Sequence, residues 1–241
     1  MLLVLPISVI QNSAILIFAN SAEKDGGIKN FGGDISLLNN LTVHTLEIVS
    51  ASGLPYYHFT EKEQNGSTFG ERFSAAIQSV FDQGHTHIIA IGNDSPQLKK
   101  QHLIKTQRLL EAGKLVVGPS MDGGFYLIGL SHSQFNIAQF KALPWQLPSL
   151  LNETHSYFTC KGENVVLLDP LMDVDSSADV KRLSNFTKSL SKKWLVLFSL
   201  IFNKRGRIET MKNEVFKINF QDIQYNKGSP LFAFPTFVLQ R

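Results

Sequence analysis

The stretch His87-Ile-Ile-Ala-Ile91-Gly-Asn-Asp94-Ser-Pro96 joins a short apolar run to a polar turn. Residues 87–91 predict a buried β-strand, because the run is short and bounded by turn-forming residues. Pro96 has no N–H to donate to a sheet, so the chain must turn there. The stretch therefore predicts a strand with an acidic residue, Asp94, just past its carboxyl end.

On both sides of this stretch, apolar runs alternate with segments of helical spacing. This alternation predicts βαβ units around a largely parallel sheet. The expected strands are residues 14–19, 54–60, 87–91, 115–117, 125–130 and 165–168. The expected helices are residues 35–50, 69–83, 99–112 and 148–161, with a last one from about residue 178. The sequence thus predicts one α/β domain with a mixed, mostly parallel sheet.

A second acidic turn, Asp122-Gly123-Gly124, follows the expected strand 115–117. Open α/β sheets bind ligands beyond the carboxyl ends of their strands, so this turn and Asp94 together predict a metal–phosphate site. Two glycines before a strand lose conformational entropy on folding, which indicates that some group lies close against their backbone. The alternatives are a tight turn at the glycine pair and a helix cap or turn at Asp94.

Further acidic residues suit a cation in the same region. Gly92 would let the backbone approach a bulky ligand, and the Asp94 carboxylate can hold a hard cation such as Mg²⁺. Asp173 and Asp175 are alternate residues, so in extended backbone they point the same way and could share one cation. The alternative is that Asp175 or Ser176 caps the final helix, and both can hold at once.

The loop after the first strand, Asn20 to Lys29, contains paired glycines together with Lys24 and Lys29. Nucleotide phosphates often lie at this place in α/β proteins. The loop matches neither G-x-x-x-x-G-K-[ST] nor G-x-G-x-x-G, so a solvated basic loop is the alternative.

The composition is that of a globular protein, with 241 residues, 43% apolar and 18% charged. The single Cys160 excludes an intramolecular disulfide framework and a cysteine cluster for zinc or iron–sulfur, and agrees with a reducing, cytoplasmic setting. The sequence has no G-x-S-x-G elbow, no H-E-x-x-H motif and no ribbon of aromatic and basic residues. We therefore expect neither a serine hydrolase, nor a zinc protease, nor a nucleic-acid-binding protein.

The two ends of the chain differ from its body. Residues 1–10 are apolar like part of a signal peptide, but no cationic segment precedes them and they run almost directly into the first strand. Residues 188–241 carry ten Lys or Arg against three Asp or Glu, whereas the body is mildly acidic. We therefore expect a domain over residues 1–187 and a basic C-terminal extension over residues 188–241. The extension would be an accessory element or a dimer contact, with a solvated basic face as the alternative.

The apolar run Trp194 to Phe202 lies in that extension. It is far shorter than the roughly 20 residues that a membrane-spanning helix needs, so we expect no integral membrane span. A buried helix end or strand is expected, with a membrane-surface anchor as the alternative. A homodimer could cover the run.

Several motifs occur in an order and spacing that resemble a known family. They are Ile89-Ala-Ile-Gly-Asn-Asp94-Ser-Pro-Gln-Leu98, Val117-Gly-Pro-Ser-Met-Asp122-Gly-Gly-Phe-Tyr-Leu-Ile-Gly-Leu130, Leu143-Pro-Trp145 and Asp173-Val-Asp175-Ser. Over residues 14–187 the chain resembles GT-A-like transferases known as radical-SAM/selenodomain-associated, or glycosyltransferase-like. That family is similar to 2-phospholactate and molybdenum-cofactor guanylyltransferases.

The resemblance implies a three-layer α/β/α GT-A-like fold of the nucleotide-diphospho-sugar transferases. It also implies a nucleoside triphosphate or nucleotide sugar, a small-molecule acceptor, and Mg²⁺ or Mn²⁺ as cofactor. Carried over by position, the catalytic residues would be Asp94 and Asp122, and the metal ligands Asp94, Asp173 and Asp175. The nucleotide and substrate contacts would be Asn20, Lys24, Lys29, Gly92, Ser95, Pro96, Gly123 and Gly124. In this assignment the two lysines approach phosphates, and Asp122 lies on the acceptor side as the candidate general base.

The first loop departs from the family pattern. Relatives carry a lysine shortly after the first strand and a Val-Lys-Thr-Arg-Leu block, where this chain has Asn20 and Ile28-Lys-Asn-Phe-Gly32. One Lys and one Arg are thus missing where a triphosphate would be bound. A metal-dependent nucleotidyl- or glycosyltransferase is the function that the resemblance implies. A catalytically silent binding or interaction protein of the same fold is the alternative.

Overall fold

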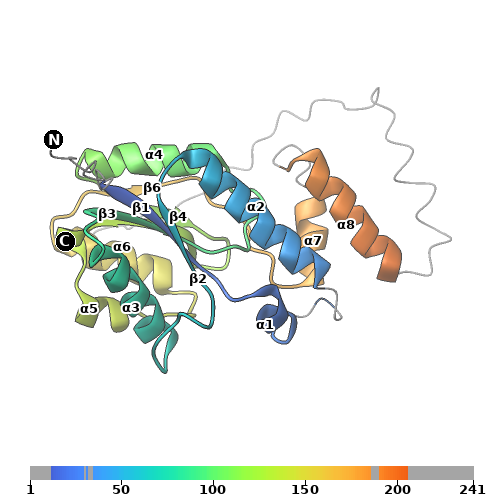
Figure 1. Ribbon diagram of the computed structural model, residues 1–241, viewed down its shortest axis with the longest axis horizontal. Helices are drawn as coiled ribbons and strands as arrows, with labels where there is room; N and C mark the ends of the chain where they lie inside the picture. Colours follow the sequence, from blue (N-terminus) through green and yellow to red (C-terminus); the bar gives the residue numbers. More distant parts are fainter. Residues whose placement is uncertain (1–11, 30, 32–34, 186–189, 206–241) are drawn as a thin grey trace, which may run out of the picture. The chain divides into compact units, whose positions relative to one another are not determined.

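Six strands form one sheet, in the order β2-β1-β3-β5-β4-β6 (Figure 1). The computed structural model describes residues 12–29, 31, 35–185 and 190–205. The strands are β1 (Ser13–Phe18), β2 (Tyr56–Phe59), β3 (His87–Ile91), β4 (Leu115–Pro119), β5 (Phe125–Ser131) and β6 (Val165–Leu167). The apolar start at residues 1–10 and the C-terminal extension beyond residue 205 lie outside the described residues.

The sheet is mixed and mostly parallel, as the sequence predicted. β1 pairs in parallel with β2 and β3, and β4 pairs in parallel with β6. β5 is antiparallel to both of its neighbours, β3 and β4. The carboxyl ends of the parallel strands and the amino end of β5 therefore lie along one edge of the sheet, which we call the carboxyl edge.

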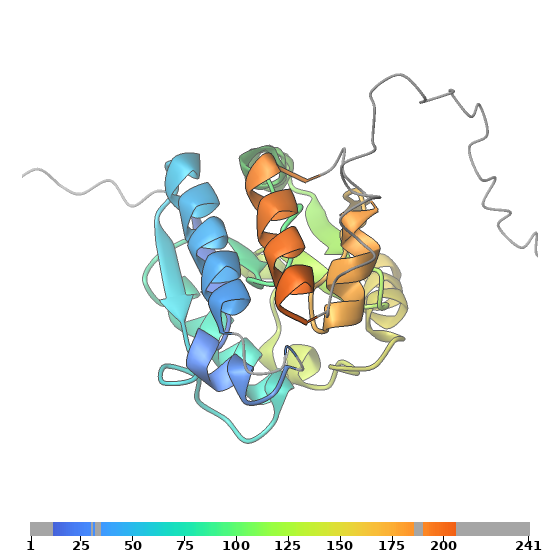
Figure 2. The same ribbon diagram turned by 90° about the vertical axis from the view of Figure 1, so that its right-hand side faces the viewer.

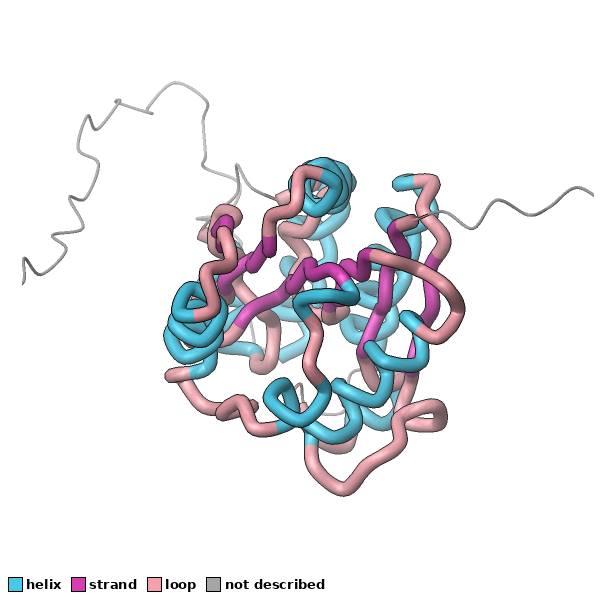
Figure 3. Tube along the Cα trace, turned by 90° about the vertical axis from the view of Figure 1, so that its left-hand side faces the viewer, coloured by secondary structure: helices cyan, strands magenta, loops and turns pink. Residues whose placement is uncertain are grey.

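Helices cover both faces of the sheet, so the expected three-layer α/β/α architecture is confirmed (Figures 1 and 3). α2 (Ser36–Ser52) and α4 (Lys100–Glu111) pack on one face. α3 (Phe69–Phe81), α5 (Ile137–Lys141) and α6 (Leu150–Cys160) pack on the other. The remaining elements are α1 (Ala22–Gly26), a 3₁₀ turn (His132–Gln134), α7 (Ser177–Ser184) and α8 (Lys192–Arg205).

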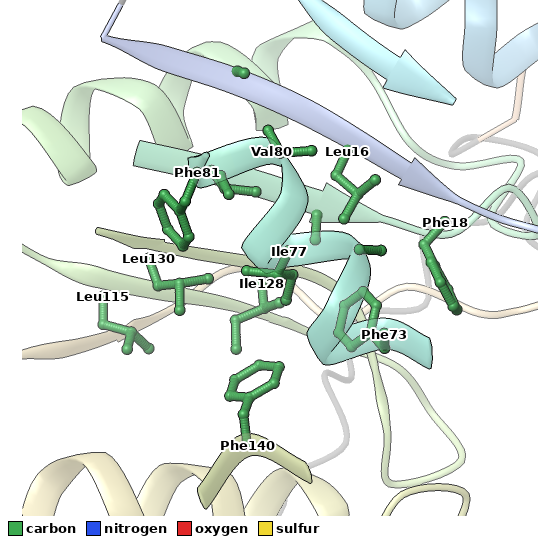
Figure 4. Packing of buried hydrophobic residues seen from close by; sticks show 14 of the residues in the cluster. Leu16, Phe18, Phe73, Ile77, Val80, Phe81, Leu115, Ile128, Leu130 and Phe140 are labelled. Carbon is green, nitrogen blue, oxygen red and sulfur yellow. The ribbon is translucent and has the colours of Figure 1, made fainter. Parts of the chain in front are cut away.

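Strand β1 illustrates how the sheet carries two cores. Leu16 and Phe18 face the α3 side and pack with Ile77 (Figure 4). Ile15 and Ile17 face the side of α2 and α4. Since alternate side chains of a strand point to opposite faces, both sets are buried when helices cover both faces.

Every strand and helix predicted through residue 168 is present, with both ends within two residues of the predicted bounds, and β3 matches residues 87–91. The short elements α1, α5 and the 3₁₀ turn were not predicted, and α1 lies in the segment expected to be a loop. The start of α3 shows why the sequence was informative. The Thr68 side chain accepts the N–H of Glu71 at 3.2 Å, and the Glu71 carboxylate accepts the N–H of Thr68 at 3.1 Å. This reciprocal capping box fixes the first turn of the helix.

Tight turns occupy the edge of the sheet opposite the carboxyl edge. Each of the four turns that lead from a helix into β2, β3, β4 and β6 contains a glycine with positive φ. They are Gly53 (77°), Gly84 (95°), Gly113 (73°) and Gly162 (81°). The longer loops lie at the carboxyl edge.

The first turns of α8 pack beside α2 (Figure 2). Trp194 and Phe198 are each 1% exposed, and the Trp194 ring meets the His44 ring edge-on at a centroid distance of 5.2 Å. Lys193 forms an ion pair with Glu47 at 3.5 Å. This part of the apolar run is therefore a buried helix segment.

The first compact unit of the chain ends at Ser199, within α8. The division at residues 187 and 188 that we expected from charge stays a prediction. Within the described ranges, no helix has both the length and the apolar character needed to cross a membrane.

Candidate functional site

A pocket of about 530 Å³ opens at the carboxyl edge of the sheet. Its walls come from the ends of β1 and β3, the turn between β4 and β5, the segment after β6, the start of α3 and the loop at residues 145–150. Four aspartates singled out from the sequence line it, namely Asp94, Asp122, Asp173 and Asp175. Segments far apart in the chain meet here because the strands that precede them end at the same edge.

Lys29 of the first loop forms ion pairs with two of these acids. Its Nζ lies 3.3 Å from Asp94 Oδ2 and 2.9 Å from Asp175 Oδ1, and it donates to the Val174 carbonyl at 3.5 Å. Burial alone would lower the pKa of Lys29, but the carboxylates of Asp94 and Asp175 outweigh burial and raise its pKa above the ordinary value. Lys29 is therefore a largely buried ammonium that bridges two acids.

Asp173 is largely buried beside Ser95, whose hydroxyl donates to Asp173 Oδ1 at 2.6 Å. Burial, and next the negative charge of Asp94, raise the pKa of Asp173 to about 8, although the hydrogen bond from Ser95 opposes this rise. Asp122 adds to the same repulsion. An added cation or proton would therefore relieve the repulsion between the acids of this pocket.

Asp175 does not act as a helix cap. Ser176 is the N-cap of α7, and its N–H and Oγ donate to the Asp179 carboxylate at 2.9 and 2.7 Å. The Asp175 carboxylate instead pairs with Lys29, while burial raises its pKa against the effect of that ion pair. Asp94 does not cap a helix either, since α4 begins only after Lys99. Both acids therefore line the pocket, where they pair with Lys29.

The Asp122 turn combines the two alternatives that the sequence left open. Ser120 Oγ and the N–H of Gly124 donate to Asp122 Oδ1 at 2.5 and 2.9 Å, which closes a tight turn. Among the described residues, Oδ2 of Asp122 has no hydrogen-bond partner, and the residue is exposed at the pocket. The carboxylate can therefore hold the turn with one oxygen and meet a ligand with the other.

The group that lies against the glycine pair belongs to the chain itself. Gly123 has a φ of 94°, and a Cβ at this position would overlap the carbonyl of Pro148. The N–H of Leu151 donates to the Gly123 carbonyl at 2.9 Å. The close approach that the sequence indicated is therefore made by Pro148 at Gly123. This contact ties the Asp122 turn to the loop at residues 145–150.

The other predicted contact residues divide into two groups. Gly92 and Gly124 line the pocket. Asn20, Lys24, Ser95, Pro96 and Gly123 are not among the described residues that line it. Asn20 donates to Asp25 at 2.8 Å, Lys24 is exposed on α1, and Ser95 acts through its bond to Asp173. The residues of this second group are therefore not part of the pocket wall, where they would contact a ligand directly.

The predicted metal set of Asp94, Asp173 and Asp175 is not assembled as a three-ligand site. In the described part of the chain, no three His, Cys, Asp or Glu side chains are grouped so that they could hold a metal ion. The physical reason is Lys29, which bridges Asp94 and Asp175. Carboxylate oxygens are nevertheless the ligands that Mg²⁺ and Mn²⁺ take together with waters and phosphates. The donor set, with a buried acid of raised pKa, fits a cation that displaces or joins Lys29.

An aromatic wall lines the same pocket as the acids, and the sequence did not single it out as a group. Phe69, Phe125 and Trp145 are half-buried and line the pocket. The Trp145 ring lies 5.4 Å from Phe69 and 5.7 Å from Phe125 between centroids, and its Nε1 donates to the Phe140 carbonyl at 2.8 Å. Phe125 and Trp145 belong to two of the quoted motifs, but nothing in the sequence joined them, and Phe69 reads as part of the apolar face of a helix.

Comparison with known proteins gives one family match. Residues 56–146 match the model of a family described as uncharacterized proteins conserved in bacteria (DUF2064). The matched segment contains Asp94, Asp122 and Trp145. None of the curated proteins matches the chain.

Solved structures resemble the chain over most of its length. One is a protein of Desulfovibrio desulfuricans G20, described provisionally as a nucleotide-diphospho-sugar transferase. It is 20% identical, with a TM-score of 0.69 and coverage of 80% of this chain and 98% of that one. Rv0371c of Mycobacterium tuberculosis H37Rv is 14% identical, with a TM-score of 0.45 and coverage of 72% and 97%. A complex of Rv0371c with manganese is 14% identical, with a TM-score of 0.42 and coverage of 72% and 98%. The first of these similarities shows that the fold is the one of nucleotide-diphospho-sugar transferases.

Proposed function

We propose that this chain is a metal-dependent nucleotidyl- or glycosyltransferase that acts on a nucleoside triphosphate or a nucleotide sugar. The observation that carries the proposal is the gathering of Asp94, Asp122, Asp173 and Asp175 along one pocket at the carboxyl edge. The fold shared with the Desulfovibrio protein supports it by analogy. The finer resemblance, to radical-SAM/selenodomain-associated transferases and to guanylyltransferases, is part of the same proposal and rests on the motifs around Asp94 and Asp122.

The acids on the Lys29 side of the pocket would serve the donor. Asp94, Asp173 and Asp175 would hold Mg²⁺ or Mn²⁺, which when bound neutralises charge on the donor phosphates. Lys29 is paired with Asp94 and Asp175. When a cation replaces it there, its ammonium becomes available to the phosphates, in the role assigned to it from the sequence.

Asp122 would serve the acceptor as a general base. One of its oxygens is fixed by Ser120 and Gly124, so the other can take a proton from an acceptor hydroxyl. The acceptor oxygen then forms a bond to the donor phosphorus or sugar carbon. The bond to pyrophosphate or to a nucleoside diphosphate breaks in the same displacement.

A binding protein without catalysis is the second candidate. The observation that favours it is the absence of any Lys, Arg or His among the described residues that line the pocket. Since Lys29 already pairs with two acids, the phosphates of a nucleotide would meet carboxylates unless a cation is added.

A thermal-shift screen separates the two candidates. Nucleotides and nucleotide sugars are tested with EDTA, with Mg²⁺ and with Mn²⁺. A ligand at about 100 times its Kd stabilises the folded state by about 2.7 kcal/mol, which is several degrees in Tm for a domain of this size. The transferase proposal requires a rise in Tm that depends on the metal, and a flat response across the panel supports the binding protein.

Replacing Asp94 tests the assigned metal ligand. Asp94→Asn keeps the shape of the side chain and removes its charge, so we expect the metal-dependent rise in Tm to disappear. Asp82→Asn, at an exposed acid that ends α3, is the control and should keep the rise. A full rise in the Asp94→Asn protein would remove Asp94 from the metal site.

Location and assembly belong to the same proposal. A cytoplasmic location is supported by the free, exposed thiol of Cys160, which is typical of reducing compartments. A homodimer was expected as cover for the apolar run from Trp194, but Trp194 and Phe198 are already covered within the first compact unit. Val196 is 60% exposed and is the part of this run that a second copy could cover.

A further inference from the structure

The pocket has an apolar wall in addition to its acidic residues. The rings of Phe69, Phe125 and Trp145 form a continuous, half-buried surface, which Leu147 extends with 56% of its surface exposed. Half-buried aromatic rings in a concave site offer contact area to a planar or apolar ligand group at little cost in side-chain entropy.

The acidic turn and the apolar wall are held together by the backbone. Gly123 packs against the Pro148 carbonyl, and the N–H of Leu151 donates to the Gly123 carbonyl at 2.9 Å. Phe125 follows the same turn directly and starts β5. A ligand on the aromatic wall would therefore lie next to the Asp122 turn. The backbone contacts hold the turn and the wall in place without a ligand.

The charge of the lining has one sign. Four aspartates line the pocket, and the described lining residues include no Lys, Arg or His. Since burial raises the pKa of Asp173 to about 8, the charged acids at pH 7 are Asp94, Asp122 and Asp175. Lys29 pairs with Asp94 and Asp175, whereas Asp122 has no ion-pair partner in the described part of the chain. A negative potential focused in a cleft attracts cations and repels anions.

We propose that the pocket binds a protonated amine that carries an apolar or aromatic group, with the ammonium against Asp122 and the apolar group on the Trp145 wall. The inference rests on the proposed function, because this molecule is the acceptor that the transferase would use. The ammonium is a recognition group, and a different atom of the acceptor forms the new bond. In this arrangement the free oxygen of Asp122 binds the ammonium, so Asp122 recognises the acceptor instead of serving as its general base. An anionic acceptor would meet the same carboxylates with repulsion.

Trp145 provides the signal for the test. Benzylamine, benzyl alcohol and benzoate share one ring and differ in charge, and each is titrated at pH 7 in EDTA while tryptophan fluorescence is recorded. We expect saturable quenching by benzylamine at a concentration at least tenfold below that for benzyl alcohol, and none by benzoate. Trp145→Phe should abolish the quenching, since Trp194 is buried elsewhere.

A charge variant separates recognition of the ammonium from contact with the wall. Asp122→Asn keeps Oδ1 as acceptor for Ser120 and Gly124, so the turn is retained. It should raise the half-saturating concentration of benzylamine about tenfold, which corresponds to about 1.4 kcal/mol, and leave that of benzyl alcohol unchanged. Asp82→Asn should change neither value. Equal quenching by all three ligands, or benzylamine binding unaffected by Asp122→Asn, would overturn the inference.

The outcomes are distinguishable from those of the nucleotide screen. A metal-dependent nucleotide response without preference for the amine overturns this inference and leaves the transferase in place. Selectivity for benzylamine without any nucleotide response supports the amine pocket and removes the acceptor role that we gave it.

Discussion

At the scale of single residues, Lys29 determines how much uncompensated negative charge the pocket carries. Its side chain is 14% exposed, and its Nζ lies within 3.3 Å of both Asp94 and Asp175. The ammonium neutralises negative charge on these two acids, as a bound divalent cation would.

We predict that Lys29→Met destabilises the metal-free protein at pH 7 by about 1–3 kcal/mol, because two partly buried carboxylates lose their partner. Added Mg²⁺ should restore more stability to this variant than to the unchanged chain. Urea denaturation with EDTA and with Mg²⁺ measures both effects. Lys24→Met, at an exposed lysine of the neighbouring helix α1, should have neither effect. Equal stability of the two variants would show that the ion pairs of Lys29 contribute nothing.

The pKa of Asp173 predicts how stability depends on pH. Its pKa is about 8 in the folded state and 3.8 in the reference state, so the folded protein binds the extra proton between these values. Stability of the metal-free protein should therefore fall as pH rises from about 4 to about 8. The Asp173→Asn side chain cannot ionise, so this variant should not lose stability for this reason as pH rises. At pH 8 it should therefore be more stable than the unchanged chain by at least about 1 kcal/mol.

Urea denaturation at pH 5 and pH 8 in EDTA measures this difference. The advantage of Asp173→Asn should shrink toward pH 5, because this pH lies only slightly above 3.8, where the unfolded chain begins to release the proton that the native acid keeps. Asp82→Asn, at an exposed acid, should show no such dependence. An advantage that is equal at both pH values would contradict the assigned pKa.

At the scale of elements, the turn between β4 and β5 depends on one glycine. Gly123 combines a φ of 94° with direct contact to Pro148, whereas Gly113 has a φ of 73° and open space around it. We predict a loss of about 1 kcal/mol for Gly113→Ala and at least about 3 kcal/mol for Gly123→Ala, since the second adds a collision with backbone. Urea denaturation compares the two, and equal losses would show that the Pro148 contact is readily relaxed.

The strands and the acidic turns could be predicted because their signals are local. Apolar runs bounded by Gly or Pro gave the strands, and the rule for carboxyl ends brought Asp94 and Asp122 to one edge. The place of β5 between β3 and β4 depends on pairing across many residues, which no short motif specifies. Lys29 reaches Asp94 from 65 positions away, and such a contact follows from loop conformation. Trp145 is held at the pocket by its hydrogen bond to the Phe140 carbonyl and by packing on Phe69 and Phe125, and no short motif specifies these contacts.

At the scale of the whole molecule, the first compact unit includes the first turns of α8. Trp194 and Phe198 are each 1% exposed. Ending the chain after Ser199 should therefore keep stability, whereas ending it after Leu190 should cost roughly 3–5 kcal/mol through loss of two buried aromatic side chains. Thermal and urea unfolding of both shortened chains test this. Equal stability would favour the boundary near residue 187 that the charge pattern indicated.

The glycine turns at the far edge of the sheet have a practical consequence. Cys160 ends α6 just before one of them, while Leu150 at the other end of the same helix lines the pocket. Eleven residues of helix span about 16 Å at a rise of about 1.5 Å per residue. The protein could therefore be attached to a sensor surface through this sole thiol without blocking the pocket. Ligand binding could then be measured without introducing any substitution.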